Sequence, residues 1–165
     1  MNHVQFSVRT ELIKDADDVE APWPVVDILI DGRDLRELVR SFELSFAAAE
    51  GHPELAGQYG APTADEVLPP SRHFWGEPSE RLYVYDDKVS VFGCSCRCPM
   101  CWPLLVRIEA NARTVTWSDF EQPHRRGNTG SPWRYDHFGP FRFSRRQYDD
   151  ALQSAAKDLA RWKPR

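Results

Sequence analysis

All four cysteines of the chain lie within eight consecutive residues, and this cluster constrains the fold more than any other feature of the sequence. The spacing is Cys94-x-Cys96-x-Cys98-x-x-Cys101. Apolar and β-branched residues on both sides of the cluster predict one strand over residues 89–92 and another over 104–109. The cysteines therefore occupy the predicted connection between two neighbouring strands, where one short loop brings several thiols together.

Alternating or continuous apolar runs predict strands along most of the chain. The predicted strands cover residues 4–8, 25–30, 82–85, 89–92, 104–109, 114–120 and 141–143. The four consecutive strands between residues 82 and 120 have short connections, so we expect an antiparallel meander with the cysteines at its middle connection.

Two segments carry apolar residues at helical spacing. The first follows Asp34, which has Glu37 three positions later as in a capping box, and the predicted helix runs over 35–49. The second follows Ser144, with Gln147 in the corresponding position, and runs towards the C-terminus. The pattern predicts an α+β fold, in which a mainly antiparallel sheet of about five to six strands carries two amphipathic helices packed on it.

The size and composition of the chain indicate its class. A length of 165 residues with 41% hydrophobic and 28% charged residues predicts a single domain over 1–165. No apolar run approaches the ~18 residues of a membrane-spanning helix, and no apolar signal segment follows the start. We therefore expect a cytoplasmic protein without membrane association, in which clustered cysteines indicate metal or redox chemistry rather than structural disulfides.

Zinc is the metal that best matches this set of donors. Structural zinc sites use four thiolate or imidazole ligands in a tetrahedron. One short loop supplies three ligands easily and a fourth only with a tight wrap. The best distant candidate is His124, because it follows the strand that is predicted to pair with the strand leaving Cys101.

Two other interpretations of the cysteines remain open at this stage. Cys98 and Cys101 form a C-x-x-C motif that could close a redox-active disulfide, although no predicted helix begins there to stabilise a thiolate. The cysteines could also be small buried residues without any ligand. We found no nucleophile elbow, zinc-protease, P-loop or dinucleotide-binding motif in the sequence, and we name no catalytic residues.

The charges divide unevenly along the chain. Residues 1–80 contain six basic and 16 acidic residues, a net charge of −10, whereas residues 81–165 have a net charge of +6. Arginines and aromatic residues alternate in the segment 124–146, a composition that nucleic-acid-binding surfaces use. The simpler interpretation is that the basic half pairs with the acidic half inside one fold.

Several short motifs in the C-terminal part resemble a family of small uncharacterised bacterial proteins. The motifs are Cys94-Ser95-Cys96, Cys101-Trp102-Pro103-Leu104, Val115-Thr116-Trp117-Ser118-Asp119-Phe120, Pro123-His124-Arg125, Phe141-Arg142-Phe143 and Gln147-Tyr148. The resemblance covers roughly residues 82–152 and implies no established activity. The family pattern has glycine at the positions of Arg97 and Met100 and lacks Cys98.

The resemblance therefore implies a ligand set of Cys94, Cys96, Cys101 and His124, with Cys98 as an alternative ligand. The function that we expect is a small non-enzymatic binding protein, immunity- or antitoxin-like, that carries a structural zinc site and recognises a protein partner. One alternative is a thiol-redox or metal-dependent enzyme that uses Cys98 and Cys101. The third is a nucleic-acid-binding module that uses the arginine- and tryptophan-rich segment 124–146.

Overall fold

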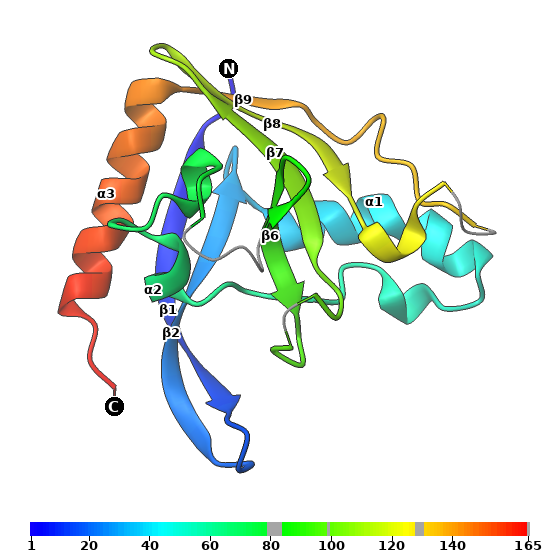
Figure 1. The fold of residues 1–165 in the computed structure, drawn as a ribbon, viewed down its shortest axis with the longest axis horizontal. Coiled ribbons are helices and arrows are strands. Elements are labelled where there is room, and N and C mark those ends of the chain that lie inside the picture. The colour runs from blue at the N-terminus through cyan, green and yellow to red at the C-terminus, as the bar shows by residue number, and fades with distance from the viewer. Residues whose placement is uncertain (79–83, 99, 128–130, 165) are drawn as a thin grey trace.

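The chain adopts the predicted α+β fold, with two antiparallel sheets and helices packed on them (Figure 1). The structure is a computed structural model that describes residues 1–78, 84–98, 100–127 and 131–164. Within these ranges, no helix is both long and apolar enough to cross a membrane.

The larger sheet contains the predicted meander. Its strands are β4 (Tyr59–Gly60), β5 (Val84–Tyr85), β6 (Lys88–Cys94), β7 (Leu104–Ala110), β8 (Thr114–Glu121) and β9 (Phe141–Ser144). The order is β4-β6-β7-β8-β9, and β5 also pairs with β6. Cys94 ends β6 and the other three cysteines lie between β6 and β7, at the middle connection as predicted. Of the predicted strand over 82–85, residues 82 and 83 lie outside the described residues.

A second, three-stranded sheet is built from the N-terminal segment, in the order β1 (Val4–Lys14), β2 (Glu20–Ile30) and β3 (Arg33–Asp34). Both long strands extend beyond the predicted ranges, and their far ends form a two-stranded ribbon that projects from the rest of the molecule (Figure 1). Pro22 and Pro24 lie within this extension of β2, opposite Leu12 and Thr10. Proline fits there because β3 reaches only the end of β2, at Leu29 and Ile30.

The helix α1 (Leu35–Ala49) matches its predicted range. Its N-cap is Asp34, whose carboxylate accepts a hydrogen bond from the Arg36 N–H at 2.7 Å. The helix α3 (Arg145–Arg161) begins after Ser144 as predicted, but the Ser144 side chain makes no capping bond. Instead of completing a capping box, Gln147 bonds to both backbone groups of Val4 on β1.

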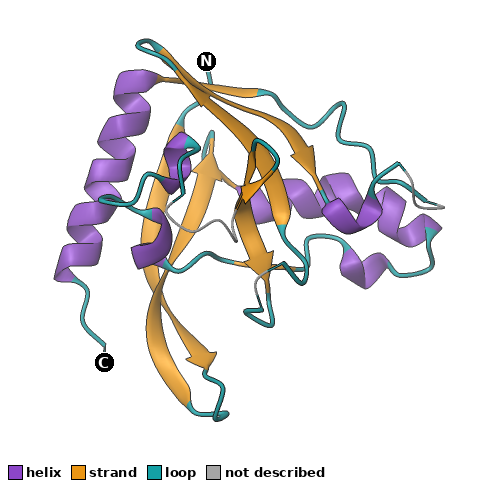
Figure 2. Ribbon diagram, in the orientation of Figure 1, coloured by secondary structure: helices purple, strands orange, loops and turns teal. Residues whose placement is uncertain are grey.

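The segment between α1 and β5 is ordered by short elements rather than by a long regular one (Figure 2). These are η1 (Pro53–Leu55), β4, α2 (Ala64–Val67) and η2 (His73–Trp75); a further short turn, η4 (Pro123–Arg125), follows β8. An aromatic side chain anchors this segment to the core. Phe74 is fully buried between Phe6 of β1, at 5.0 Å between ring centroids, and Trp117 of β8, at 5.8 Å. One aromatic side chain therefore joins the two sheets in a single core.

Candidate metal centre

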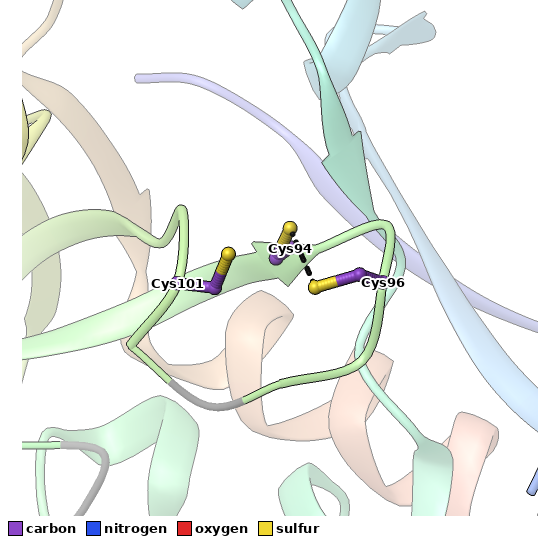
Figure 3. A group of neighbouring side chains, drawn as sticks. All are labelled: Cys94, Cys96 and Cys101. Carbon is purple, nitrogen blue, oxygen red and sulfur yellow. Dashed lines mark hydrogen bonds between the residues drawn. The ribbon is translucent and has the colours of Figure 1, made fainter. Parts of the chain in front are cut away.

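Three of the four thiols converge at the end of β6. Cys94 is the last residue of that strand, and Cys96 and Cys101 lie on the loop that leads to β7. All three side chains point towards a common centre (Figure 3), and their sulfur atoms lie within 4.8 Å of one another. The Sγ atoms of Cys94 and Cys96 are 3.1 Å apart. This arrangement could hold a metal ion, as predicted from the clustering of the cysteines.

Two residues with left-handed backbone conformation close the loop around this centre. Arg97 has φ of 65° and Met100 has φ of 68°, values that glycine adopts without the steric cost that other residues have. Backbone bonds from the Arg97 N–H to the Cys94 carbonyl, at 3.0 Å, and from the Cys101 N–H to the Cys98 carbonyl, at 3.4 Å, support the two turns. These are the two positions at which the resembled family has glycine, so the backbone shape fits the family pattern although the residues differ.

The neighbouring β4 fixes the start of the loop from the other side. Tyr59 pairs with Cys94, and Gly60 pairs with Gly93. A β-carbon on Gly60 would lie 3.0 Å from the Cys94 carbonyl oxygen, so the two backbones approach too closely for a larger residue. The position of Cys94 is therefore held by the pairing of β6 with β4, whereas the other thiols depend on the loop.

The thiols differ in acidity because they bond to one another. The side-chain hydrogen bond between Cys96 and Cys94, together with the bond to the Cys98 backbone, lowers the pKa of Cys96 to about 7. Donation to Cys94 and Cys96, and the negative charge near them, raise the pKa of Cys101 to about 12. The pKa of Cys98 is raised for the same reason, chiefly by its hydrogen bond to Cys96. The pKa of Cys96 is therefore lowered while those of Cys98 and Cys101 are raised, and a bound dication would lower the pKa of every thiol that coordinates it.

The spacing of the sulfurs suits a tetrahedral zinc ion after small shifts. A Zn–S bond of ~2.3 Å gives sulfur–sulfur distances of about 3.8 Å in a tetrahedron. The observed limit of 4.8 Å and the 3.1 Å contact bracket this value. Cys96, Cys98 and Cys101 are exposed and Cys94 is half-buried, so an ion can reach the thiols from solvent.

There are two candidates for a fourth ligand: Cys98 lies on the loop itself, and His124 contacts the loop. Cys98 lies outside the group of three but shares a side-chain hydrogen bond with Cys96. His124, on η4, places its Nε2 atom 3.1 Å from the Met100 carbonyl oxygen. Because a carbonyl oxygen only accepts, Nε2 carries a proton in this arrangement and donates it. The assignment of His124 therefore stays a prediction, and it requires that nitrogen to exchange the carbonyl for the metal.

A cluster of aromatic and charged side chains packs against the cysteine loop. The imidazole of His124 stacks on Trp102, at 5.8 Å between centroids and an interplanar angle of 6°. The Arg125 guanidinium lies 5.1 Å from the Trp102 ring centroid and 5.7 Å from that of Trp133. Glu50, the C-cap residue of α1, accepts hydrogen bonds from both Arg125, at 3.0 Å, and the Trp133 indole, at 2.7 Å. The cysteine loop is thereby connected to the first helix.

Arg97 anchors the cysteine loop through contacts that the sequence analysis did not predict. Its guanidinium donates to the Ala61 carbonyl oxygen, at 2.5 Å, and to Glu11 on β1, at 2.7 Å. Since the partners lie 36 and 86 positions earlier in the chain, no local sequence signal could have indicated them. The pairs Arg97–Glu11 and Arg125–Glu50 are thus two ion pairs that join the basic C-terminal half to the acidic N-terminal half.

The comparisons with known proteins do not assign the chain to a group. No protein-family model matches the sequence, and neither the curated proteins nor the solved structures contain a match to it.

Proposed function

We propose that this chain is a small zinc-binding protein that acts by recognising a protein partner, and that the metal has a structural role. The observation that carries the proposal is the convergence of Cys94, Cys96 and Cys101, whose sulfurs lie within 4.8 Å of one another at the end of a strand. Thiolates favour soft or borderline metals over magnesium or calcium, and zinc commonly takes four such ligands. A metal with four protein ligands has no open position for a substrate, which supports a structural role.

The fourth ligand is the point at which two versions of the proposal differ. Cys98 has the advantage of an existing thiol contact with Cys96, and its loop carries few other restraints. His124 would tie the loop to η4 and so connect the metal to the cluster around Trp102. The four-cysteine site is the version that needs less rearrangement, because His124 already uses its Nε2 atom.

The redox alternative has less support in the geometry than the metal. It assigns the chemistry to Cys98 and Cys101, yet hydrogen bonds and neighbouring negative charge raise the pKa of both thiols. A reactive thiol needs a lowered pKa near neutrality, and Cys96 is the residue with that property. A redox reaction would therefore begin at Cys96, paired with Cys94 rather than with Cys101.

The nucleic-acid alternative also has less support. Base stacking requires exposed aromatic faces, but Trp133 and Tyr135 are buried and donate to Glu50 and Glu43 inside the protein. Arg125 is likewise engaged with Glu50. Among the described residues of this segment, these aromatic side chains therefore stabilise the folded core instead of offering faces for base stacking.

The metal is tested by purifying the protein without chelator and measuring its zinc content, followed by cobalt substitution. We expect one equivalent of metal and an intense sulfur-to-cobalt charge-transfer absorption. Cys96→Ser should abolish binding in either version. Cys98→Ser should release the metal if the site has four cysteines, whereas His124→Ala should release it if the imidazole is the fourth ligand.

His137→Ala is the matched control for His124→Ala, because His137 is an exposed histidine on the same polypeptide segment. It should leave the metal content unchanged. Metal-free protein after mild purification, together with no uptake of cobalt under reducing conditions, would contradict the proposal. A reversible Cys94–Cys96 disulfide in such a protein would favour the redox alternative instead.

The partner is tested through the neighbouring genes. An immunity- or antitoxin-like protein forms a stoichiometric complex with the toxin encoded beside it, so co-expression should yield a complex and relieve growth inhibition. If no adjacent gene product is toxic or co-purifies, the immunity interpretation is wrong. The metal site is tested independently by the zinc and cobalt measurements.

A further inference from the structure

A cavity of about 250 Å³ lies beside the cysteine loop and belongs to none of the functions considered above. Ile13 and Trp23 of the ribbon form one wall, residues 61–67 form the second, and residues 90–94 of β6 form the third. For comparison, an apolar cavity of ~150 Å³ accommodates benzene. This cavity therefore has room for one aromatic ring with a short chain attached.

The interior of the cavity is apolar and its mouth is aromatic. Val91 and Phe92 are fully buried and line it together with Ile13. Trp23 also lines the cavity, yet 42% of this large residue remains exposed, which is unusual for a side chain with so much apolar surface. An indole beside an open cavity offers both apolar contact and a negatively polarised ring face.

The charges around the cavity are negative. Asp65 and Glu66 of α2 line it and both are exposed, and the negative charge of Glu66 acts on the neighbouring His73 imidazole. The positive charge of Arg97 is already compensated, since its guanidinium bonds to Glu11 and to the Ala61 carbonyl oxygen. Burial lowers the pKa of His73, which disfavours a positive charge on this imidazole.

From this combination we infer that the cavity binds an ammonium group carried on an apolar stem. The stem packs against the accessible side chains of Ile13 and Trp23, and the ammonium group lies between the carboxylates of α2 and the Trp23 ring. Ligand sites commonly combine a mostly apolar lining with a few polar groups that set orientation. An anionic ligand would be repelled by the two carboxylates, and a neutral apolar ligand would gain nothing from them.

The inference goes beyond the zinc site and does not depend on it. Cys94 and Cys98 line both the cavity and the cysteine loop, so the state of the loop must be controlled in the experiment. Binding is therefore measured on reduced metal-free protein and on zinc-loaded protein in parallel. A failure of zinc binding leaves the first measurement intact, and a failure of amine binding leaves the zinc proposal intact.

The probe is 2-phenylethylamine, compared with 2-phenylethanol and with 3-phenylpropanoate, which have similar size but neutral and negative end groups. Binding is followed by amide chemical shifts in NMR spectra. We expect saturable shifts in residues 61–67 and 90–94 with the amine, weaker ones with the alcohol and none with the carboxylate. Added salt should weaken amine binding, because the contact with exposed carboxylates is screened.

The variants Asp65→Asn and Glu66→Gln should each weaken amine binding by roughly two- to fivefold, the range expected for an exposed ion pair. Trp23→Leu should weaken it by a similar factor. Glu37→Gln is the matched control, an exposed carboxylate on α1 away from the cavity, and should change nothing. Equal binding of amine and carboxylate, or equal affinities of Glu66→Gln and Glu37→Gln, would overturn the inference.

The amine could be a free small molecule or a lysine side chain of a partner peptide, and a second arm distinguishes these sources. A short peptide with one lysine between apolar residues is compared with the same peptide acetylated on that lysine. Binding of phenylethylamine identifies a small-molecule site. Binding of the lysine peptide alone, lost on acetylation, identifies a peptide site, and binding of neither probe overturns the inference.

Discussion

The Arg97 guanidinium lies 2.7 Å from Oε1 of Glu11 and so joins the cysteine loop to the N-terminal ribbon. Both side chains are more than half shielded from solvent, with exposed fractions of 22% and 32%. A charge-assisted bond in this environment is stronger than one at a fully exposed site. This pair therefore contributes to the placement of the ribbon against the cysteine loop.

A double-mutant cycle with Arg97→Ala and Glu11→Ala should therefore show a coupling energy of about 1 kcal/mol, at the upper end of the range for partly exposed pairs. The measurement is urea unfolding of the four proteins. Arg40 and Glu37 provide the control, because this exposed pair at 4.0 Å should show a coupling near zero. Equal coupling energies in the two cycles would mean that Arg97 does not hold the ribbon.

Met100 should be replaceable by glycine without loss of stability. Its φ of 68° carries a steric cost for any residue with a β-carbon, and the side chain is 41% exposed. Removing the β-carbon relieves ~1 kcal/mol or more, offset in part by the greater freedom of glycine in the unfolded chain. We expect the free energy of unfolding to fall in the order Gly, Asn, Met, Val at this position. Chemical denaturation of these variants is the test, and a valine variant as stable as the glycine variant would contradict it.

Glu43 should make stability depend on pH. Burial raises its pKa above the ordinary value of 4.5, although bonds from the Gly57 N–H, Tyr59 and Tyr135 oppose the rise. The folded state then holds the proton more tightly than the unfolded state. The stability that this carboxyl group contributes is complete below pH 4.5 and falls as the pH rises through the raised pKa.

Glu43→Gln removes this titration, so the wild-type free energy of unfolding minus that of the variant should decrease as the pH increases across that window. Urea unfolding at a series of pH values measures the difference. Glu37→Gln, which removes an exposed carboxylate from the same helix, should keep the wild-type slope. A constant difference between wild type and Glu43→Gln would show that burial does not govern this group.

Tyr148→Phe should lose about 2–4 kcal/mol of unfolding free energy. The Tyr148 hydroxyl accepts from the Trp117 indole N–H at 3.0 Å and donates to the Phe74 carbonyl oxygen at 2.5 Å, all in the buried core. Its removal leaves one donor and one acceptor without partners, each costing ~1–3 kcal/mol. The free energies come from denaturant midpoints with unchanged slopes.

Tyr59→Phe is the comparison for this variant, because it makes the same chemical change without leaving a group unpaired. Glu43 keeps its bonds from Tyr135 and Gly57, and Gln122 keeps the Pro103 carbonyl oxygen. Its loss should be nearer 1 kcal/mol. Equal losses for the two variants would contradict the account of the Trp117–Tyr148–Phe74 chain.

The features that could be predicted from the sequence are those that residues close together in the chain determine. The helix over 35–49 follows from an N-cap at Asp34 and a regular apolar stripe, and both can be recognised within one segment. The convergence of Cys94, Cys96 and Cys101 likewise needs only a short loop between two strands. The division of the strands into two sheets depends on pairing partners that lie far apart, so it was not predictable.

Features created by distant contacts escaped the sequence analysis for the same physical reason. The cavity draws its walls from the segments 13–23, 61–67 and 90–98, and no single segment has the pattern of a binding site. Glu43 occupies the buried stripe of α1 beside Val39 and Ala47, where a periodicity argument expects an apolar residue. Its two tyrosine partners come from β4 and from the segment before β9.

The side chain of Gln147 accepts from the Val4 N–H at 3.1 Å and donates to the Val4 carbonyl oxygen at 2.6 Å, as a neighbouring strand would. β1 is an edge strand of its sheet, and edge strands are sites of unwanted pairing between chains. During synthesis the first strand emerges long before residue 147. The edge of β1 therefore stays open to other chains until α3 leaves the ribosome. A nascent or truncated chain without α3 is prone to aggregate through this edge, whereas a chain with α3 is protected there by Gln147.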